Sequence, residues 1–550
     1  MLQIKLIFKT VFFSVFTILF LNSCQNNSKN NWKANVINSV EGDVAVVGSI
    51  DIMNILNKSD IMNSEFLPEE YKGMMNMYVL NTLKSENLGF KIEGNNHVVV
   101  VVNETGEFDY VFFMADVLDE KKMSKNLKFL IGGSKEVKDY NYLTTSEGVV
   151  IAWDEKNVIG LLQTPKNKKS TNSISILSKL LDSRDDNSIK SSEDLTDFLE
   201  RKDDINAFVY SDVYSKMTLS LSGMGNDKFN SLDFKDRNVV FSGNINNGNI
   251  LFESSFDSPN QDNELRPFME KPINSNYLNY LSNNGQLLAF FLANINIEGI
   301  VKSPELILQF GQVFKELEKS LKQFDLNLED ISNTITGEMS FSILDLNTNF
   351  DASADISDAF GSNDDDFFND LSEDEFYEFY DNYDNQNSET TPKMLLSLGI
   401  KNKNSIVNLF KKFNYEVSEN VIVNLDNQIS FLLKDKTLFI GSPESLLVLL
   451  NENGKLIKYN PINEIDTPIY GFINTDTMLI PNNFRNQIDD EFGAAYMNLL
   501  SEIKYVEFKS TVSSGRLEIV MDNKQENALK VLVNSILKSF SNNVPIESFI

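Results

Sequence analysis

Hydrophobic and polar positions follow the same pattern in two segments, one in each half of the chain. Residues 44–56 (VAVVGSIDIMNIL) and residues 288–300 (LAFFLANINIEGI) each begin with an apolar run and continue into a mixed stretch. A short apolar run is typical of a buried strand, and the apolar spacing after it is that of a helix start. Each segment therefore predicts a strand followed by a helix.

A second matched pair predicts a helix in each half. In residues 115–130 and 398–413, Met123 and Leu127 align with Ile406 and Phe410. Residues four apart lie on one helix face, so each pair marks an apolar stripe that packs on a core.

Three further pairs follow in the same order along the chain: residues 152–162 with 432–442, 205–217 with 467–479, and 239–255 with 506–522. The pair 152–162 and 432–442 predicts hairpins with charged turns. The pair 239–255 and 506–522 predicts hairpins at the glycine turns Asn247-Gly248 and Ser514-Gly515. Five ordered matches predict an internal duplication. The alternative is that they are general α+β patterns.

The offset between the matched segments grows from 244 to 283 residues within the second half. The growth coincides with an acidic stretch, Asp351–Asp384, which has 13 carboxylates and no basic residue. Residues 351 to about 391 are therefore predicted to be an insertion in the second copy.

The predicted fold class is α+β, with two tandem, internally duplicated modules of mostly antiparallel sheet covered by helices. Antiparallel pairing is expected because the strands come as hairpins and do not alternate regularly with helices. The predicted modules span residues 41–275 and 276–548, after a signal peptide (1–23) and a polar tether (24–40).

The N-terminus has the features of a signal peptide that ends at a cysteine. Lys5 and Lys9 precede the apolar run Thr10–Leu21, which is too short to span a bilayer. Leu21-Asn22-Ser23-Cys24 follows and resembles the lipobox of bacterial lipoproteins. The resemblance implies attachment of a diacylglycerol, with acyl chains such as palmitate, to the Cys24 thiol as a thioether, and cleavage before Cys24. The alternative is an ordinary signal peptide with a chance cysteine.

The residues after Cys24 bear on the predicted location. Gln25 is not the Asp that often retains such lipoproteins in the inner membrane, and no acidic export run follows. We expect a lipid anchor in the outer membrane that faces the periplasm. Cys24 is the sole cysteine, so the mature chain is expected to have no disulfide.

Together, the lipobox, the polar tether, the opening strand and helix, and the two tandem halves resemble an uncharacterised lipoprotein family of Gram-negative bacteria. That family is known as a domain of unknown function. The resemblance would cover nearly the whole mature chain. It rests on hydrophobic patterns, so it implies the fold and no functional residue.

Composition restricts the possible partners. The full chain has a net charge of −30, and removal of residues 1–23 with their two lysines makes it about −32. Such a surface repels phosphate backbones, which argues against nucleic acid as a partner. A hydrophobic content of 42% is sufficient for packed cores.

Candidate chemistry is sparse. His97, the one histidine, is expected at the start of a strand, as a solvent-exposed edge residue and not a catalyst. A single histidine excludes a histidine-cluster zinc site, and any Ser-His-Asp triad would need His97. No nucleophile elbow, P-loop or EF-hand loop occurs. We therefore assign no catalytic, cofactor-binding or metal-binding residue, and no cofactor.

The acidic insertion has one alternative to a solvated loop. Phe376, Phe379, Tyr380 and Tyr383 have helical spacing, so a short amphipathic helix could bind a partner. Asp364, Asp365 and Asp366 could collect calcium, although they lack the fixed spacing of a calcium loop.

The sequence therefore predicts a non-enzymatic binding or scaffold lipoprotein of the cell envelope. Its partners would be the membrane, through the lipid on Cys24, and an envelope protein or glycan. The alternative is an acid-catalysed hydrolase of envelope or dietary glycans that uses an Asp/Glu pair.

Overall fold

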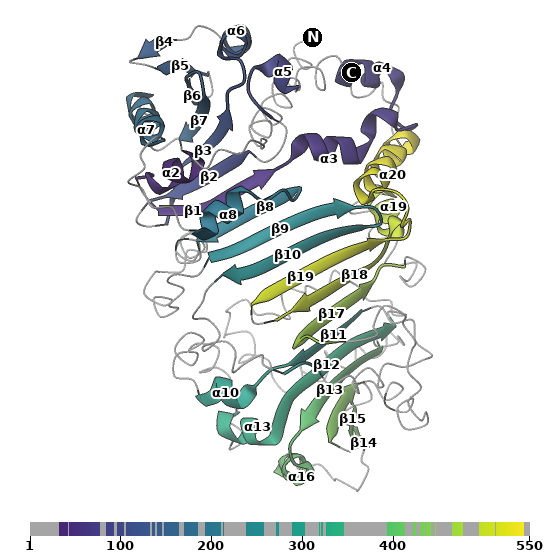
Figure 1. The fold of residues 1–550 in the computed structure, drawn as a ribbon. Helices are drawn as coiled ribbons and strands as arrows, with labels where there is room; N and C mark the ends of the chain where they lie inside the picture. Colours follow the sequence, from purple (N-terminus) through teal and green to yellow (C-terminus); the bar gives the residue numbers. More distant parts are fainter. Residues whose placement is uncertain are drawn as a thin grey trace, which may run out of the picture. The chain divides into compact units, whose positions relative to one another are not determined.

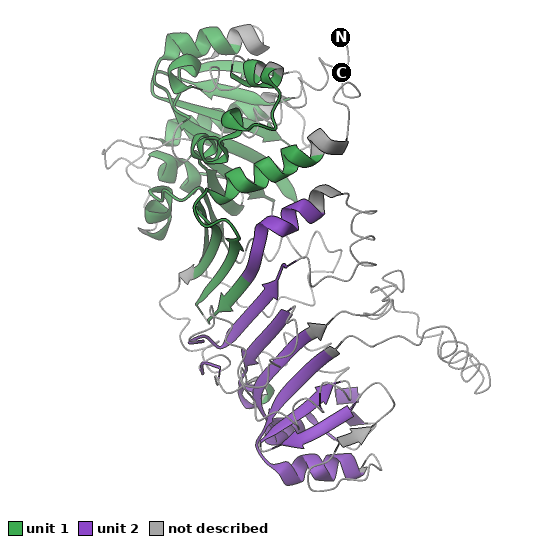
Figure 2. Ribbon diagram, turned by 90° about the vertical axis from the view of Figure 1, so that its right-hand side faces the viewer, with its two compact units in different colours: residues 1–268, 300–316, 507–550 green, residues 269–299, 317–506 purple. Residues whose placement is uncertain are grey.

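The structure is a computed structural model of the 550-residue chain. It describes residues 32–41, 43–76, 84–92, 96–103, 106–131, 135–137, 140–145, 148–163, 170–184, 193–210, 213, 238–257, 271–273, 289–302, 318–319, 321–322, 326–345, 393–412, 422–424, 430–434, 436–441, 446, 465–476, 494–511 and 513–543. The chain forms two compact units (Figure 2). Unit 1 comprises residues 1–268, 300–316 and 507–550, and unit 2 comprises residues 269–299 and 317–506.

Unit 1 contains strands and short helices (Figure 1). Its described helices are α2 (Trp32–Asn38), α3 (Ile52–Ser59), η1 (Ile61–Asn63), α4 (Glu69–Met74), α5 (Ser85–Leu88), α6 (Glu120–Ile131), α7 (Ser170–Ser183), α8 (Glu193–Leu199) and α20 (Ala528–Asn543). Its described strands are β1 (Asp43–Ile50), β2 (His97–Val102), β3 (Phe108–Asp116), β4 (Lys135–Val137), β5 (Tyr140–Thr144), β6 (Val150–Trp153), β7 (Asn157–Gln163), β8 (Ile205–Tyr210), β9 (Asn238–Asn246), β10 (Asn249–Asp257) and β19 (Ser514–Met521).

The described helices of unit 2 are α13 (Leu328–Thr334), α16 (Lys403–Lys412) and α19 (Ala494–Glu502). Its described strands are β11 (Ala289–Asn294), β12 (Ile335–Asp345), β13 (Lys393–Ile400), β14 (Ile422–Asn424), β15 (Ser430–Lys434), β16 (Thr437–Gly441) and β17 (Ile469–Asn474). Two elements cross the division between the units: α10 (Ile297–Lys302) and β18 (Ile503–Ser510).

Local sequence explains several element boundaries. Asp51 caps α3, because its carboxylate accepts a hydrogen bond from the Asn54 amide, and Asp60 ends the helix with a left-handed backbone. Asn327 and Asp330 form a reciprocal capping box at the start of α13. The valine run of β2 is β-branched, which favours a strand.

The sheet of unit 1 is antiparallel throughout its described pairings. Its strand order is β4-β5-β6-β7-β3-β2-β1-β8-β9-β10-β19. Alternate residues of each strand point to opposite faces. We call the two faces the His97 face and the Phe241 face, after one residue on each.

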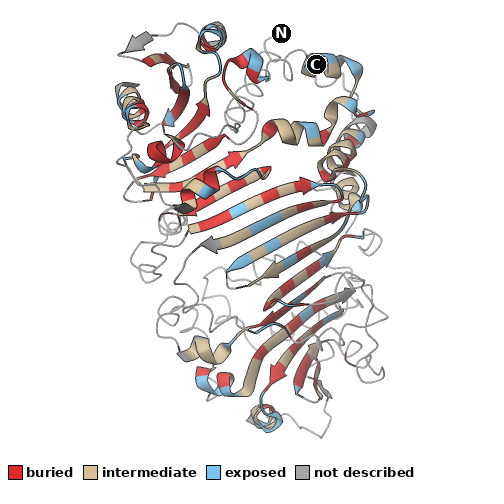
Figure 3. Cartoon of the chain, viewed as in Figure 1, coloured by how far each residue is buried: buried red, intermediate tan, exposed pale blue. Residues whose placement is uncertain are grey.

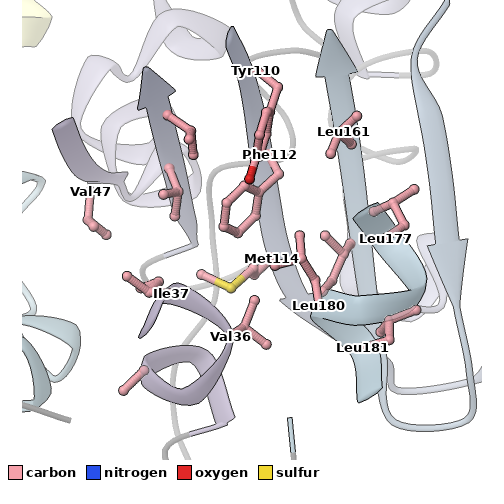
Figure 4. Close-up of a cluster of buried hydrophobic side chains, with 14 of the residues drawn as sticks. Val36, Ile37, Val47, Tyr110, Phe112, Met114, Leu161, Leu177, Leu180 and Leu181 are labelled. Atoms are coloured by element: carbon pink, nitrogen blue, oxygen red, sulfur yellow. The ribbon is translucent and has the colours of Figure 1, made fainter. Parts of the chain in front are cut away.

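Both faces of β3, β6 and β7 carry a hydrophobic core. On the His97 face, Phe112 and Met114 pack with residues of α2 and α7 (Figure 4), and α8 contributes Phe198. On the opposite face, Trp153 packs with Met123 and Leu127 of α6. The predicted helix stripe at Met123 and Leu127 is therefore confirmed as a core contact.

The described pairings of unit 2 form a second antiparallel series, β14-β15-β16-β13-β12-β11-β17. The same order occurs in unit 1 as β5-β6-β7-β3-β2-β1-β8. In this comparison β11, β12 and β13 correspond to β1, β2 and β3, and β14 to β17 correspond to β5 to β8. Phe290, Tyr470 and Phe472 stack in its core. Ile406 and Phe410 of α16 belong to a separate small cluster.

The described structure confirms an α+β fold with mostly antiparallel pairing, and it corrects the sequence expectations for the tether and for one of the glycine turns. The predicted tether includes α2, in which Lys33 to Ile37 are buried. The apolar residues of α2, Ala34, Val36 and Ile37, belong to the hydrophobic core of unit 1, so this part of the predicted tether is part of the fold. Ser514 and Gly515 are not a turn but the first residues of β19. The turn at Asn247-Gly248 is confirmed, with Gly248 in a left-handed backbone.

Residues 507–550, which the sequence places in the second module, pack within unit 1. The reason is that β19 pairs with β10 from Asn249↔Val520 to Ser255↔Ser514. The acidic residues 351–391 lie outside the described residues. The strands on either side of them pair directly, with Asp345 opposite Lys393. In unit 1 the corresponding strands, β2 and β3, are joined by residues 103–107.

Candidate functional site

His97 is the first residue of β2, as expected for a strand start, but it is not at a solvent-exposed edge. Its side chain is 1% exposed. The ring of Phe198 on α8 packs edge-on against it at 6.2 Å, and the Lys33 ammonium of α2 lies 3.4 Å from its Nδ1. The expectation of exposure was wrong because two helices distant in sequence cover this end of the strand.

The protonation state of His97 follows from these contacts. Burial lowers the pKa of the imidazole well below its usual value, and the Lys33 charge lowers it further. The ring is therefore neutral at pH 7. An ammonium can only donate, so Nδ1 accepts and Nε2 carries the proton. Nε2 is buried and has no hydrogen-bond partner among the protein's described groups.

A row of polar residues continues from His97 across six neighbouring strands of the His97 face. Directly paired positions along it are His97, Ser49, Asn206, Ser242, Glu253 and Arg516. The Asn206 amide donates to Ser49 Oγ at 3.3 Å, and the Glu253 carboxylate lies 3.8 Å from the Arg516 guanidinium. The row is buried at its histidine end and exposed at its arginine end.

The arrangement of Ser49 beside His97 does not form a catalytic triad. A triad needs a carboxylate at the second imidazole nitrogen to stabilise the imidazolium. Here the group at Nδ1 is the Lys33 ammonium, which opposes protonation. A buried carboxylate just before β8, Asp204, is bound to Lys58 at 2.6 Å and to the Ile245 amide.

A polar depression with a volume of about 380 Å³ lies beside the turn between β6 and β7. It is lined by Glu120, Asn141, Asp154, Glu155 and Lys156. The Asp154 carboxylate is already bound, because it accepts hydrogen bonds from the turn amides at 2.7 and 2.8 Å and forms an ion pair with Arg184. Asp154 therefore holds the β6–β7 turn, and Glu120 and Glu155 are the remaining acids.

The Phe241 face carries an apolar groove, and this is the candidate functional site. Phe241, Phe252 and Phe508 border it and are between 37 and 46% exposed. The groove has a volume of about 200 Å³. Exposed positions recur along β9, β10 and β19 in Figure 3.

Strand register explains the composition of the groove. Phe241 pairs with Ala207 and Ser254, and Phe252 pairs with Gly243 and Leu517. These side chains share one face. Ser242, Glu253 and Arg516 also border the groove, but alternation directs their side chains to the His97 face. The groove surface is therefore almost wholly apolar.

Small residues form the floor of the groove. A Cβ added to Gly243 would lie 3.1 Å from the Phe252 ring, so that ring lies over the glycine. A Cβ on Gly515 would lie 2.8 Å from Ser254 Oγ. The missing side chains at these positions, with the methyl of Ala207, leave the space between the phenylalanines.

Unit 2 has an exposed apolar surface of its own. Phe291 and Phe341 are directly paired on β11 and β12 and are about two-fifths exposed. Ile473 of β17 and Met394 of β13 lie on the same face and are also exposed.

The sequence did not single out the groove residues. Phe241 and Phe252 lie on one face of a hairpin, but an alternating strand shows the same pattern when that face is buried. Their pairing with Ala207, Gly243 and Leu517 involves strands far apart in sequence. The signal that could have found the site is the presence of small residues opposite large aromatic residues.

The other predicted features have these outcomes. Cys24, the calcium candidates Asp364, Asp365 and Asp366, and the aromatic stripe Phe376 to Tyr383 lie outside the described residues. Among the residues that the structure describes, no three His, Cys, Asp or Glu side chains cluster as metal ligands. No described helix is long and apolar enough to span a membrane.

Comparison with known families decides the classification. The profile of a family described as a domain of unknown function, DUF4836, matches residues 35–529. The chain belongs to the DUF4836 family. The match includes the last four residues of α2 and the strands that form the groove. No curated protein matches this DUF4836 chain.

Solved structures of the protein TP0453 are similar to parts of the DUF4836 chain. Crystal form I is 8% identical, covers 40% of this chain and 78% of its own, and has a TM-score of 0.23. Crystal form IV is 12% identical, covers 44% of this chain and 88% of its own, and has a TM-score of 0.22. At these TM-scores the similarity supports no argument about fold or function.

Proposed function

We propose that the protein is a lipid-anchored, non-enzymatic binding protein of the cell envelope that holds an apolar ligand in the groove of unit 1. The anchor part rests on Leu21-Asn22-Ser23-Cys24. In this proposal the lipid on Cys24 anchors the protein in the outer membrane, and the protein faces the periplasm.

The observation that carries the binding function is the groove between Phe241, Phe252 and Phe508. A concave apolar surface with exposed aromatic walls is a common form of ligand site. A fold without such a role would be more stable in water if these three rings were buried or replaced by polar residues.

The binding function is tested by photocrosslinking in intact cells. A photoreactive phenylalanine analogue placed at position 252 should give a covalent adduct with the ligand. The same analogue at position 108 is the control, because Phe108 is at least as exposed as Phe252 but does not line the groove. Equal adducts at both positions, or none at 252, would reject the groove as a binding site.

The anchor is tested separately. A palmitate analogue should label the wild type, and Cys24→Ala should abolish the label and release the protein from membranes. Labelling of the Cys24→Ala variant would contradict the lipoprotein assignment.

We also infer that the two series of strands arose by internal duplication. Their common order in chain sequence, and the helices α6 and α16 that follow β3 and β13, support this inference. Superposition of β1–β3 and α6 on β11–β13 and α16 tests it in an experimental structure. Different strand directions in the two sets would reject it.

The alternative function is a glycan hydrolase that uses Glu120 and Glu155 in the polar depression. Two carboxyl groups roughly 5–10 Å apart are needed for acid and nucleophile or base. Hydrolysis of envelope or dietary glycans that is lost in both Glu120→Gln and Glu155→Gln would establish this alternative.

A further inference from the structure

We infer that the groove of unit 1 binds one acyl chain of a zwitterionic membrane phospholipid. This inference rests on the proposed binding function and names the class of its ligand. It uses the size of the groove, the absence of charge on its face, and the net charge of the chain.

The size of the groove favours a single chain over a protein partner. A stable protein–protein interface buries about 800 Å² on each partner. The groove has a volume of about 200 Å³ between three aromatic walls, which is the scale of one hydrocarbon chain. A methylene group takes up roughly the space of a water molecule, about 30 Å³, so about seven methylenes would fill it.

The lining favours hydrocarbon without a charged end. The side chains on this face are apolar except for Ser254, and the neighbouring Glu253 and Arg516 point to the opposite face. Nothing in the groove would neutralise a charged group that entered it, and burial of an unpaired charge is costly. The ligand's polar group must therefore remain outside.

The charge of the protein selects among membrane lipids. The chain has a net charge of −30, which repels anionic head groups over about a Debye length. A zwitterionic head group is not repelled in this way. The predicted anchor at Cys24 would hold the groove close to a supply of such lipids.

The experiment uses the mature soluble Cys24→Ala chain and the apolar fluorophore N-phenyl-1-naphthylamine. Displacement by n-alcohols from butanol to decanol should improve about fourfold per added methylene, because each buried methylene adds a constant increment. The improvement should level off at about seven carbons. Dihexanoylphosphatidylcholine should displace the fluorophore at least fivefold better than dihexanoylphosphatidylglycerol at low salt.

Two serines provide a matched pair of variants. Ser254 lines the groove, and Ser255 is the next residue and points to the opposite face. Ser254→Leu should weaken binding of the fluorophore and of octanol at least tenfold, whereas Ser255→Leu should leave both unchanged. Circular dichroism and the melting temperature verify that each variant is folded.

Several outcomes would overturn the inference. These are equal binding by Ser254→Leu and Ser255→Leu, affinity that rises steadily to decanol, or no displacement by phosphatidylcholine. Stronger displacement by phosphatidylglycerol would exclude the zwitterionic ligand. If photocrosslinking at position 252 still gives an adduct, the acyl-chain inference alone has failed. If crosslinking fails as well, the proposed binding function has failed.

Discussion

At the scale of single residues, His97 links the stability of unit 1 to pH. The imidazole is buried beside the Lys33 ammonium, so its pKa in the folded protein is well below its usual value of 6.5. Below pH 6.5 the unfolded chain binds a proton that the folded chain excludes. The free energy of unfolding therefore falls as the pH falls from 6.5 towards the folded pKa.

We expect this linkage to be visible in urea unfolding followed by circular dichroism at pH 7.5, 6.5 and 5.5. The histidine contributes a loss of up to about 1.4 kcal/mol per pH unit below 6.5. The His97→Gln variant should lack this contribution, so the difference between it and the wild type should change by about 1 kcal/mol between pH 6.5 and 5.5. Parallel pH profiles would show that the ring is not held neutral. Lys33→Met removes the neighbouring charge, so the pKa of His97 in the folded protein should lie closer to 6.5. The free energy of unfolding should then fall over a narrower pH range.

Gly160 illustrates a residue chosen for its lack of a side chain. It pairs with Phe113 across β3 and β7, and an added Cβ would overlap the Phe113 ring at 1.7 Å. Phe113 is itself buried, so the ring cannot move into solvent. We expect Gly160→Ala to lower the free energy of unfolding by about 1–3 kcal/mol.

Gly73 of α4 provides the control, because nothing lies within 4 Å of its added Cβ. Gly73→Ala should raise stability by up to about 1 kcal/mol through helix propensity. Chemical denaturation of the two variants measures both effects. Equal stability of the two would contradict the packing of Phe113 over Gly160.

At the scale of elements, α2 is a core helix although it consists of seven residues. Val36 and Ile37 are buried in the core of the His97 face, and Trp32 donates a hydrogen bond to Asp116 at 2.9 Å. The Asn35 amide donates to the Arg184 carbonyl at 3.0 Å. These contacts connect the helix to β3 and to the end of α7.

We therefore expect the two ends of the predicted tether to differ in truncation. A chain that begins at Trp32 should unfold at the same temperature as one that begins at Gln25. A chain that begins at Val40 should lose about 4 kcal/mol, because two large aliphatic side chains lose their burial. Differential scanning calorimetry of the three chains measures this. Identical melting temperatures would mean that α2 contributes nothing to unit 1.

At the scale of the whole molecule, the acidic insertion is expected to be dispensable for folding. Residues 351–391 join two strands that pair directly, with Ile343 opposite Met394. The described residues on either side of the segment, Asp345 and Lys393, are thus brought together by the sheet itself. The cost of closing a loop grows slowly with its length, by about 0.6 kcal/mol per doubling.

Replacement of residues 351–391 by a short Gly/Ser linker should change the free energy of unfolding by at most about 1–2 kcal/mol. A 20-residue Gly/Ser linker serves as the control and should fall within the same range. Thermal unfolding of both variants and the wild type tests this. Aggregation, or a large loss of melting temperature with both linkers, would show that aromatic residues of the segment belong to a core.

The sequence by itself determined the local features of this protein, because these depend on residues close in the chain. The strand and helix at Val44–Leu56, the stripe at Met123 and Leu127, and the hairpin at Gly248 were all predicted from spacing and turn residues. Antiparallel pairing followed from the hairpins. The lipidation of Cys24 stays a prediction.

The tertiary structure decided which faces are buried and which residues meet. His97 lies at a strand start as expected, but α2 and α8 cover it, and no local pattern specifies that packing. The groove requires Phe241, Phe252 and Phe508 to align with Ala207 and small residues of other strands. Strand register brings together residues that are up to about 300 positions apart in sequence, so a single sequence contains no local signal for the site.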